Sequence, residues 1–287
     1  MSRKLLEKIL RIDETQDPQL NRQYNSDYKK PDRVEPNIIK VPTFNWVPDK
    51  KDDRDYKYIP VGQEIIRKVD LRPFCSSIET QGKLGSCTGN AVAGAIEYLS
   101  NKSNNSIDVS RLFIYYYTRL LEGTVKYDSG AYIRDTIKAV YMYGAPKESL
   151  WPYDVSKFRI KPSSPAIKEA STRKVTRYER VNSFEGCIDA LTDGYPVTIG
   201  FYIYSSFSSE VVEKTGMMPY PDVKKEKLIG GHAVLLVGYD RDSQHFIARN
   251  SWGDGWGDKG YFYIPFRVIQ NRNLSVDFWV IKTVNNL

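Results

Sequence analysis

The feature that most constrains the fold is a change in hydrophobic pattern near residue 180 of this 287-residue chain. Before that point apolar residues recur at helical spacing. After it, short runs of β-branched and aromatic residues are separated by Gly, Asp and Asn. Helices followed by strands are typical of an α+β fold. The sequence therefore predicts a mainly helical lobe over residues 68–180 and a β-rich lobe over residues 181–287, with a cleft between them that favours a functional site.

Capping and turn residues place individual elements. Ser110 is a suitable N-cap for the second of three expected helices, and Gly123 and Gly144 stand where the second and third helices should end. The expected helices cover residues 87–100, 110–123 and 131–144, and the expected strands cover residues 195–204, 232–240, 244–252, 259–266 and 276–284.

Residues 1–67 differ from the rest of the chain in composition. They are rich in charged residues, Asn and Pro, and only a short LLEKIL segment has the spacing of an amphipathic helix. We interpret this region as an arm that wraps the folded body or stays mobile.

Charge and hydropathy limit the possible classes of function. The net charge is +7, and much of the excess of Lys and Arg lies between residues 157 and 180. Nucleic-acid binding is one explanation of this basic patch, but no nucleic-acid motif accompanies it, and a solvated basic face is the simpler explanation. We therefore expect no nucleic-acid partner. The apolar runs are too short to cross a bilayer and the charged N-terminus is unlike a secretory signal, so we expect no membrane partner.

The three cysteines are Cys75, Cys87 and Cys187. Such an odd and sparse set does not form a disulfide framework, which favours a reducing compartment. The chain has only two histidines and no Cys-x-x-Cys pair, so a structural zinc site is not expected, and no cofactor is predicted.

Cys87 is either a small buried hydrophobic residue or a nucleophile. Gly82 and Gly85 precede it and a helical pattern follows it, which places its sulfur at a helix N-terminus. There the helix dipole and the unpaired N–H groups favour a thiolate. A nucleophilic thiolate also needs a partner that accepts its proton.

His232 is the better candidate for that partner. It enters an apolar strand after two glycines, whereas His245 follows a polar turn and is expected at the surface. Asn250, eighteen residues after His232, has a side-chain oxygen suited to orienting the imidazole, and Trp252 could cover that bond. The alternatives are a core histidine and a tight glycine-rich turn, NSWGDGWG.

Taken together, these segments resemble a papain-like cysteine peptidase over residues 68–287. VDLR resembles the start of the mature enzyme, QGKLGSC the cysteine motif, GGHAVLLVGYD the histidine strand and RNSWGDGWGDKGY the asparagine segment. The stretch SGAYIRDTIKAVYMYGAPKESLWPYD resembles the substrate edge and the helix after it. The resemblance implies an α+β papain-like fold with a helical lobe, a β-barrel-like lobe and the active site between them.

The resemblance also implies the role of each residue. Cys87 would be the nucleophile, His232 the general base and then acid, and Asn250 the residue that orients His232. Gln81 and the backbone N–H of Cys87 would donate to the oxyanion. The other residues expected to border a peptide or protein substrate are Gly130, Ala131, Gly231 and Trp252.

The chain departs from the usual pattern of the family at four positions, which affect the expected substrate preference. Leu84 replaces a cysteine, Thr88 replaces an aromatic residue, Ala131 replaces a glycine, and Gly231 stands where many relatives carry Asp or Asn. The pattern is closer to the bacterial and large-virus branches than to lysosomal cathepsins, so the expected location is cytoplasmic or virion-associated.

The resemblance implies that residues 1–67 are an inhibitory pro-segment which lies in the cleft, so that the chain is made as a zymogen. A tether to another protein is the rival interpretation of the arm. The expected activity is that of an endopeptidase with an acyl-thioester intermediate, and the alternative is a catalytically silent relative that binds peptides or a partner.

Overall fold

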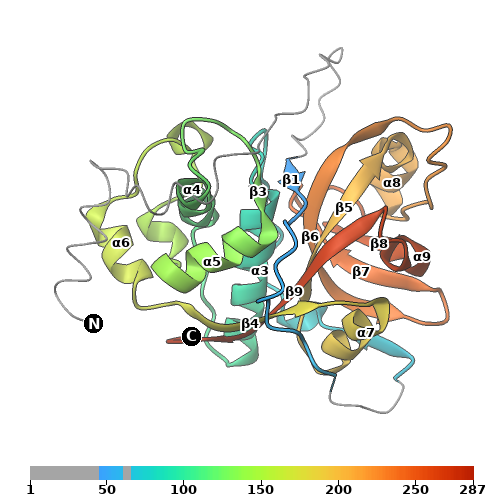
Figure 1. The fold of residues 1–287 in the computed structure, drawn as a ribbon, viewed down its shortest axis with the longest axis horizontal. Coiled ribbons are helices and arrows are strands. Elements are labelled where there is room, and N and C mark those ends of the chain that lie inside the picture. The colour runs from blue at the N-terminus through green and yellow to red at the C-terminus, as the bar shows by residue number, and fades with distance from the viewer. Residues whose placement is uncertain (1–44, 61–65) are drawn as a thin grey trace.

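The fold is that of a two-lobed α+β protein, as the sequence predicts. The computed structural model describes residues 45–60 and 66–287. Helices α4, α5 and α6 form one lobe, and a large antiparallel sheet with α7, α8 and α9 forms the other (Figure 1). The predicted LLEKIL helix lies outside the described residues.

The helices begin and end close to the predicted positions. Ser110 caps α4 by accepting a hydrogen bond from the Phe113 N–H at 3.2 Å, and Gly144 ends α5 with a φ of 83°. The α-helices are α3 (Cys87–Lys102), α4 (Arg111–Leu121), α5 (Ile133–Tyr143), α6 (Ser164–Ala170), α7 (Phe184–Thr192), α8 (Glu210–Thr215) and α9 (Phe266–Gln270). Short 3-10 helices cover Arg72–Phe74, Glu148–Leu150, Val155–Lys157 and Ser205–Ser208.

The sheet contains all five predicted strands and two more from the first part of the chain. Its strands run in the order β4-β9-β5-β6-β7-β8, and β2 pairs with the far end of β6. These strands are β2 (Lys68–Asp70), β4 (Val175–Val181), β5 (Val197–Tyr204), β6 (Leu228–Asp240), β7 (His245–Arg249), β8 (Tyr261–Pro265) and β9 (Ser275–Val284). Because β2 and β4 join this sheet, the chain enters the second lobe before residue 180.

Residues 45–60 run between the two lobes (Figure 1). Strand β1 (Trp46–Val47) pairs in parallel with β3 (Ala131–Tyr132), which occupies the first two positions of the predicted third helix. Further on, Arg180 of β4 donates its N–H to Tyr56 O at 2.6 Å and accepts from the Tyr58 N–H at 2.8 Å. The arm therefore pairs with the helical lobe at one point and with the terminal strand of the sheet at another.

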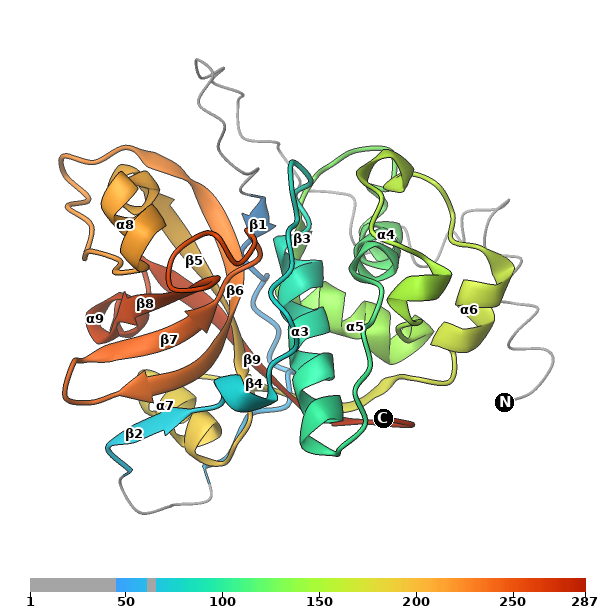
Figure 2. The same cartoon turned by 180° about the vertical axis from the view of Figure 1, so that it is seen from behind.

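Helix α3 lies against the sheet at the centre of the molecule (Figure 2). Nearly every residue of this helix is buried, on all of its faces. One hydrophobic core joins it to the sheet and includes Cys87, Ala233 and the arm residue Trp46. Helix α3 is thus the contact between lobes that positions the candidate site. In the described part of the chain, no helix is both long and apolar enough to cross a membrane.

Candidate active site

The candidate site is built on the pairing of β5 with β6. Phe201 of β5 is the register partner of His232 of β6, and both side chains are fully buried. This pairing inside the sheet fixes the imidazole on a rigid element, as the strand pattern around His232 predicts.

Asn250 orients the His232 ring. His232 Nε2 lies 2.9 Å from Asn250 Oδ1, and the same oxygen accepts the Ser251 N–H at 2.9 Å. Because a backbone N–H must face the amide oxygen, the atom opposite His232 is an acceptor. Nε2 of the imidazole therefore carries the hydrogen, and Nδ1 of the neutral ring has the acceptor lone pair.

Trp252 covers this histidine. The two rings stack with centroids 4.9 Å apart and an interplanar angle of 27°. Phe207 and Trp256 pack in turn against Trp252, with centroids 5.7 and 4.8 Å away. This aromatic cluster keeps water from one face of the His232–Asn250 hydrogen bond.

Cys87 is the first residue of α3, as predicted, and its side chain is fully buried. The backbone N–H groups of Ala233, Asn45 and Thr88 interact with its sulfur. Ala233 directly follows His232 on β6, so the structure brings the cysteine and histidine segments together across the lobe boundary.

Burial keeps both groups neutral in this arrangement. It raises the pKa of the Cys87 thiol to about 11, although hydrogen bonds from the three backbone N–H groups oppose the change. Burial lowers the pKa of His232 to about 4, against the opposing effect of its bond to Asn250. The helix N-terminus alone predicts a reactive thiolate, but here the burial of Cys87 has the larger effect on the pKa of its thiol.

Gln81 is held in place by several hydrogen bonds. Its Nε2 donates to Leu84 O at 2.9 Å, and its Oε1 accepts from Ser251 Oγ at 2.7 Å. Tyr153 Oη donates to Gln81 O at 2.9 Å and lies 2.5 Å from Ser86 Oγ. Ser251 and Tyr153 are positioning residues that the sequence analysis missed, since nothing in the sequence predicts that they meet Gln81.

The segment Asn45–Trp46 occupies the groove at the predicted substrate edge. Ala131 donates its N–H to Asn45 O at 3.2 Å. Gly130 has a φ of 71°, and a Cβ added there would lie 1.6 Å from Asn45 O. Only glycine fits at Gly130, because both the left-handed conformation and the close approach of the arm exclude a side chain.

Trp46 fills a slot between β5 and β6. A Cβ on Gly200 would lie 2.0 Å from the indole, and one on Gly231 would lie 2.7 Å from it. Tyr202 packs edge-on with its ring centroid 5.4 Å away, and only 4% of Trp46 is exposed. The two glycines thus form an indole-sized slot. Nothing in the sequence analysis predicted that Trp46 fills this slot, although it is the lone tryptophan of a polar arm.

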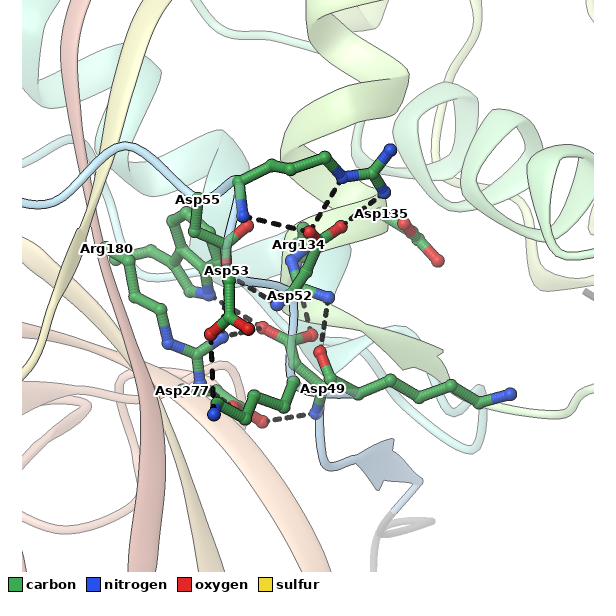
Figure 3. A network of polar contacts seen from close by, with 12 residues as sticks. Asp49, Asp52, Asp53, Asp55, Arg134, Asp135, Arg180 and Asp277 are labelled. Carbon is green, nitrogen blue, oxygen red and sulfur yellow. Dashed lines mark hydrogen bonds and ion pairs between the residues drawn. The ribbon is translucent and has the colours of Figure 1, made fainter. Parts of the chain in front are cut away.

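A polar network lies next to this slot, between the arm and both lobes (Figure 3). Asp49 and Asp55 of the arm meet Arg134 of α5 and Arg180 of β4, and Asp277 of β9 accepts from Arg180 Nη2 at 2.7 Å. Burial, and then the nearby Asp277 carboxylate, raises the pKa of Asp49 to about 7.

Other residues considered from the sequence lie away from this site or have local partners. His245 begins β7 after a turn, as predicted, and all three cysteines are free.

In the basic patch, Arg173 is buried and pairs with Glu169 at 3.0 Å, so part of the patch is structural rather than a solvated face. Within residues 45–60 and 66–287, no group of three or more His, Cys, Asp or Glu side chains is arranged to hold a metal ion.

A cysteine at a helix N-terminus, packed against a strand whose histidine meets an asparagine, is the arrangement expected of a cysteine protease. The sequence model described as papain family cysteine protease matches residues 65–276. An uncharacterised peptidase C1-like protein of Acanthamoeba polyphaga mimivirus is 41% identical over 232 residues, which cover 77% of this chain and 74% of that protein. The chain belongs to the papain family of cysteine proteases.

Solved structures agree with this assignment. The structure of Xylellain, a cysteine protease from Xylella fastidiosa, is similar with a TM-score of 0.79 and 39% identity, covering 87% of this chain and all of that one. Digestive procathepsin L 3 of Tenebrio molitor shares the fold with a TM-score of 0.60 and 20% identity, covering 78% of this chain and 73% of that one. The predicted likeness to viral and bacterial relatives, more than to cathepsins, is confirmed.

The covered site predicts that Cys87 is protected from thiol reagents in the full-length chain. Trp46→Gly should expose it, because truncating a buried tryptophan costs about 3–5 kcal/mol of packing, here mostly docking of the arm. We expect iodoacetamide to label Cys87 at least about tenfold faster in the variant than in the unchanged chain. Mass spectrometry of the labelled peptides measures the rates, with buried Cys187 as the internal control. Equal labelling rates at Cys87 would contradict the shielding role of Trp46.

Proposed function

We propose that this protease cleaves peptide bonds through an acyl-thioester on Cys87. The observation that carries the proposal is the pair of contacts on β6: His232 is hydrogen-bonded to Asn250, and the neighbouring Ala233 lies in one core with Cys87, the first residue of α3. The core therefore places the nucleophile close to the residue that directly follows its proton acceptor on β6.

The proton moves between the sulfur, the imidazole and the leaving group. Cys87 transfers its proton to Nδ1 of His232, and the thiolate attacks the substrate carbonyl carbon. When the tetrahedral intermediate collapses, the C–N bond breaks and His232 returns the proton to the leaving amine. Water then attacks the thioester with His232 as base, which releases the acid product and restores the thiol. Asn250 stabilises the imidazolium by keeping the ring in one orientation.

Gln81 and the backbone N–H of Cys87 stabilise the oxyanion. The bond from Gln81 Nε2 to Leu84 O uses one of the two amide hydrogens and fixes the direction of the other. Ser251 and Tyr153 hold the rest of the residue in place. A donor fixed before the reaction stabilises developing charge without reorganisation, an effect worth about 3–4 kcal/mol per donor.

We also propose that residues 45–60 act as an inhibitory pro-segment. Asn45 lies between the predicted substrate edge and the cysteine, Trp46 fills the adjacent slot, and both catalytic groups are neutral beneath them. Displacing the arm admits water and substrate, which removes the burial that opposes the thiolate and the imidazolium. The chain is therefore a zymogen whose activation requires residues 45–47 to leave the groove.

The catalytic assignment predicts that Cys87→Ala abolishes peptide hydrolysis, because alanine supplies no nucleophile. Cys187→Ala is the matched control, since it removes another buried thiol from the core of the second lobe. A fluorogenic peptide assay, with circular dichroism to verify folding, measures the outcome. Hydrolysis by the Cys87→Ala chain would refute the mechanism. A well-folded natural chain that binds peptides but cleaves none after the arm is weakened would favour a catalytically silent role.

The inhibitory role of the arm predicts that Trp46→Gly raises the initial rate of peptide hydrolysis. The lost packing corresponds to at least about a hundredfold larger open population. We expect the rate to rise by at least about tenfold in a fluorogenic assay. Trp46→Phe, which keeps an aromatic ring in the slot, should have a smaller effect. An unchanged rate in the Trp46→Gly chain, with Cys87 accessible to iodoacetamide, would show that the arm does not limit activity.

The Asp49 carboxyl group should tighten arm docking as the pH falls, whereas the lowered pKa of His232 under the arm acts in the opposite direction between about pH 4 and 6.5. The docked Asp49 binds a proton more strongly than an exposed aspartate with its ordinary pKa of 3.8, so docking takes up a proton. Its contribution to docking is fully present below about pH 4 and is lost as the pH rises through about 7. The groups that face Asp49 or respond to its charge are Asp277, Trp279, Arg134, Arg180 and Glu122.

Hydrogen exchange of residues 45–60 measures this dependence. After correction for the intrinsic exchange rate, the ratio of protection in the unchanged chain to protection in an Asp49→Asn chain should decrease between pH 4 and 7 by at most about tenfold per pH unit. The Asp49→Asn chain keeps the His232 contribution and loses that of Asp49, so the ratio isolates Asp49. A ratio that is constant or increases with pH over this range would contradict the assigned direction.

A further inference from the structure

Three hydrogen-bond donors or cations of the protease body converge on the side chain of Asp49. Trp279 Nε1 donates to Oδ2 at 2.7 Å, and the backbone N–H of Arg134 donates to Oδ1 at 3.1 Å. Arg180 Nη1 lies 3.5 Å from Oδ2. Because donors face both oxygens, an amide in this place would set its NH₂ group against another donor. The arrangement therefore favours an acid over an amide.

The three groups belong to three different elements of the body. Arg134 is the second residue of α5, whose N-terminus attracts negative charge, Trp279 lies in β9, and Arg180 lies in β4. The indole of Trp279 is fully buried, so its orientation is fixed by packing. The site is thus part of the folded body and does not depend on the arm for its construction.

The arm supplies part of the negative charge that balances this site. Arg134 Nη2 donates to Asp55 at 2.6 Å, and Arg180 Nη1 reaches the same carboxylate at 3.3 Å (Figure 3). When the arm leaves, Asp277 still pairs with Arg180, and the charge of Asp135 still acts on Arg134. The Trp279 N–H and the Arg134 N–H lose their acceptor. An empty site would therefore hold two guanidinium groups beside two carboxylates, with two N–H donors ready for another acidic group.

The site is continuous with the groove that holds Trp46. Asp49 follows Trp46 by three residues, a span of at most about 10 Å for an extended chain. Tyr202, which packs against Trp46, also lines a cavity of about 700 Å³ beside Asp49, Arg180 and Asp277. A peptide in the groove can therefore reach the aromatic slot and the place of Asp49 together.

We propose that Trp279, Arg134 and Arg180 form an acid-binding subsite that selects substrates after the arm leaves. The preferred peptide carries a large aromatic residue in the slot and an acidic residue about three positions away. The arm imitates this pattern with Trp46 and Asp49. This inference rests on the proposed function, since it takes the groove occupied by Asn45–Trp46 as the place where substrate binds.

Peptide binding to a full-length, non-cleaving chain tests the subsite. The chain carries Cys87→Ala to prevent turnover, together with Trp46→Gly and Asp49→Gly to weaken the arm. The probes are short fluorescein-labelled peptides with one Trp, and with Asp or Asn placed three residues before or after it. At pH 5, below the raised pKa of about 7 that an aspartate has in this place, fluorescence anisotropy should show about tenfold tighter binding of the Asp peptide than of its Asn counterpart in one of the two orientations.

Trp279→Phe in the same background should reduce this preference to within about twofold, because it removes one N–H donor and keeps an aromatic ring in the core. Trp151→Phe, in the helical lobe, is the matched control and should leave the preference unchanged. Arg180→Lys keeps the positive charge but loses the planar fork, and should weaken the preference if Trp279→Phe fails to fold.

Three results would overturn the subsite: no preference for Asp in either orientation, a preference that survives both variants, or no binding of any Trp peptide. The proposed function is tested separately by hydrolysis with Cys87 intact. A chain that binds acidic peptides but never cleaves them would refute the function alone. Cleavage without a preference for the acid would refute the subsite alone.

Discussion

The packing of α3 against β6 is the contact on which the site depends. The cysteine begins a helix and the histidine lies within a strand, and the two are separated by about half of the chain. Because α3 is buried on all of its faces and shares one core with Ala233 and the strand, neither element can shift without opening cavities. The precision required of the proposed catalytic groups therefore comes from the packing of the core, and the hydrogen bond to His232 adds to it.

The arm uses both polarity and shape to occupy the groove. The indole of Trp46 fits where two glycines leave room, and a backbone pairing with β3 fixes its position. Asp49 and Asp55 then neutralise two arginines that belong to different lobes. Desolvation under the arm also keeps Cys87 and His232 uncharged. In the proposed zymogen, blocking the groove and suppressing the chemistry would thus be two results of the same burial.

Much of the fold could be predicted from sequence, because its signals are local. Ser110 and Gly144 define helix ends through backbone geometry, and the five strands of the second lobe are β-branched and aromatic. The meeting of Asn250 with His232 was also predictable, because the residue types and the family resemblance agree on it. The parts that could not be predicted depend on long-range contacts. Nothing near Trp46 indicates a slot formed by Gly200 and Gly231, and nothing near Asp49 indicates Trp279. The raised pKa of the Cys87 thiol likewise follows from coverage by a distant segment, which the helix position alone does not reveal.

The pairing of residues 56–58 with β4 has a consequence for solubility. In the order of the sheet, β4 is a terminal strand, and Arg180 gives its backbone N–H and C=O to the arm. An uncovered terminal strand offers these groups to other chains and is a starting point for aggregation. Proteolytic loss of this part of the arm would therefore leave β4 with unpaired backbone groups and a shorter lifetime in concentrated solution, whatever it does to activity.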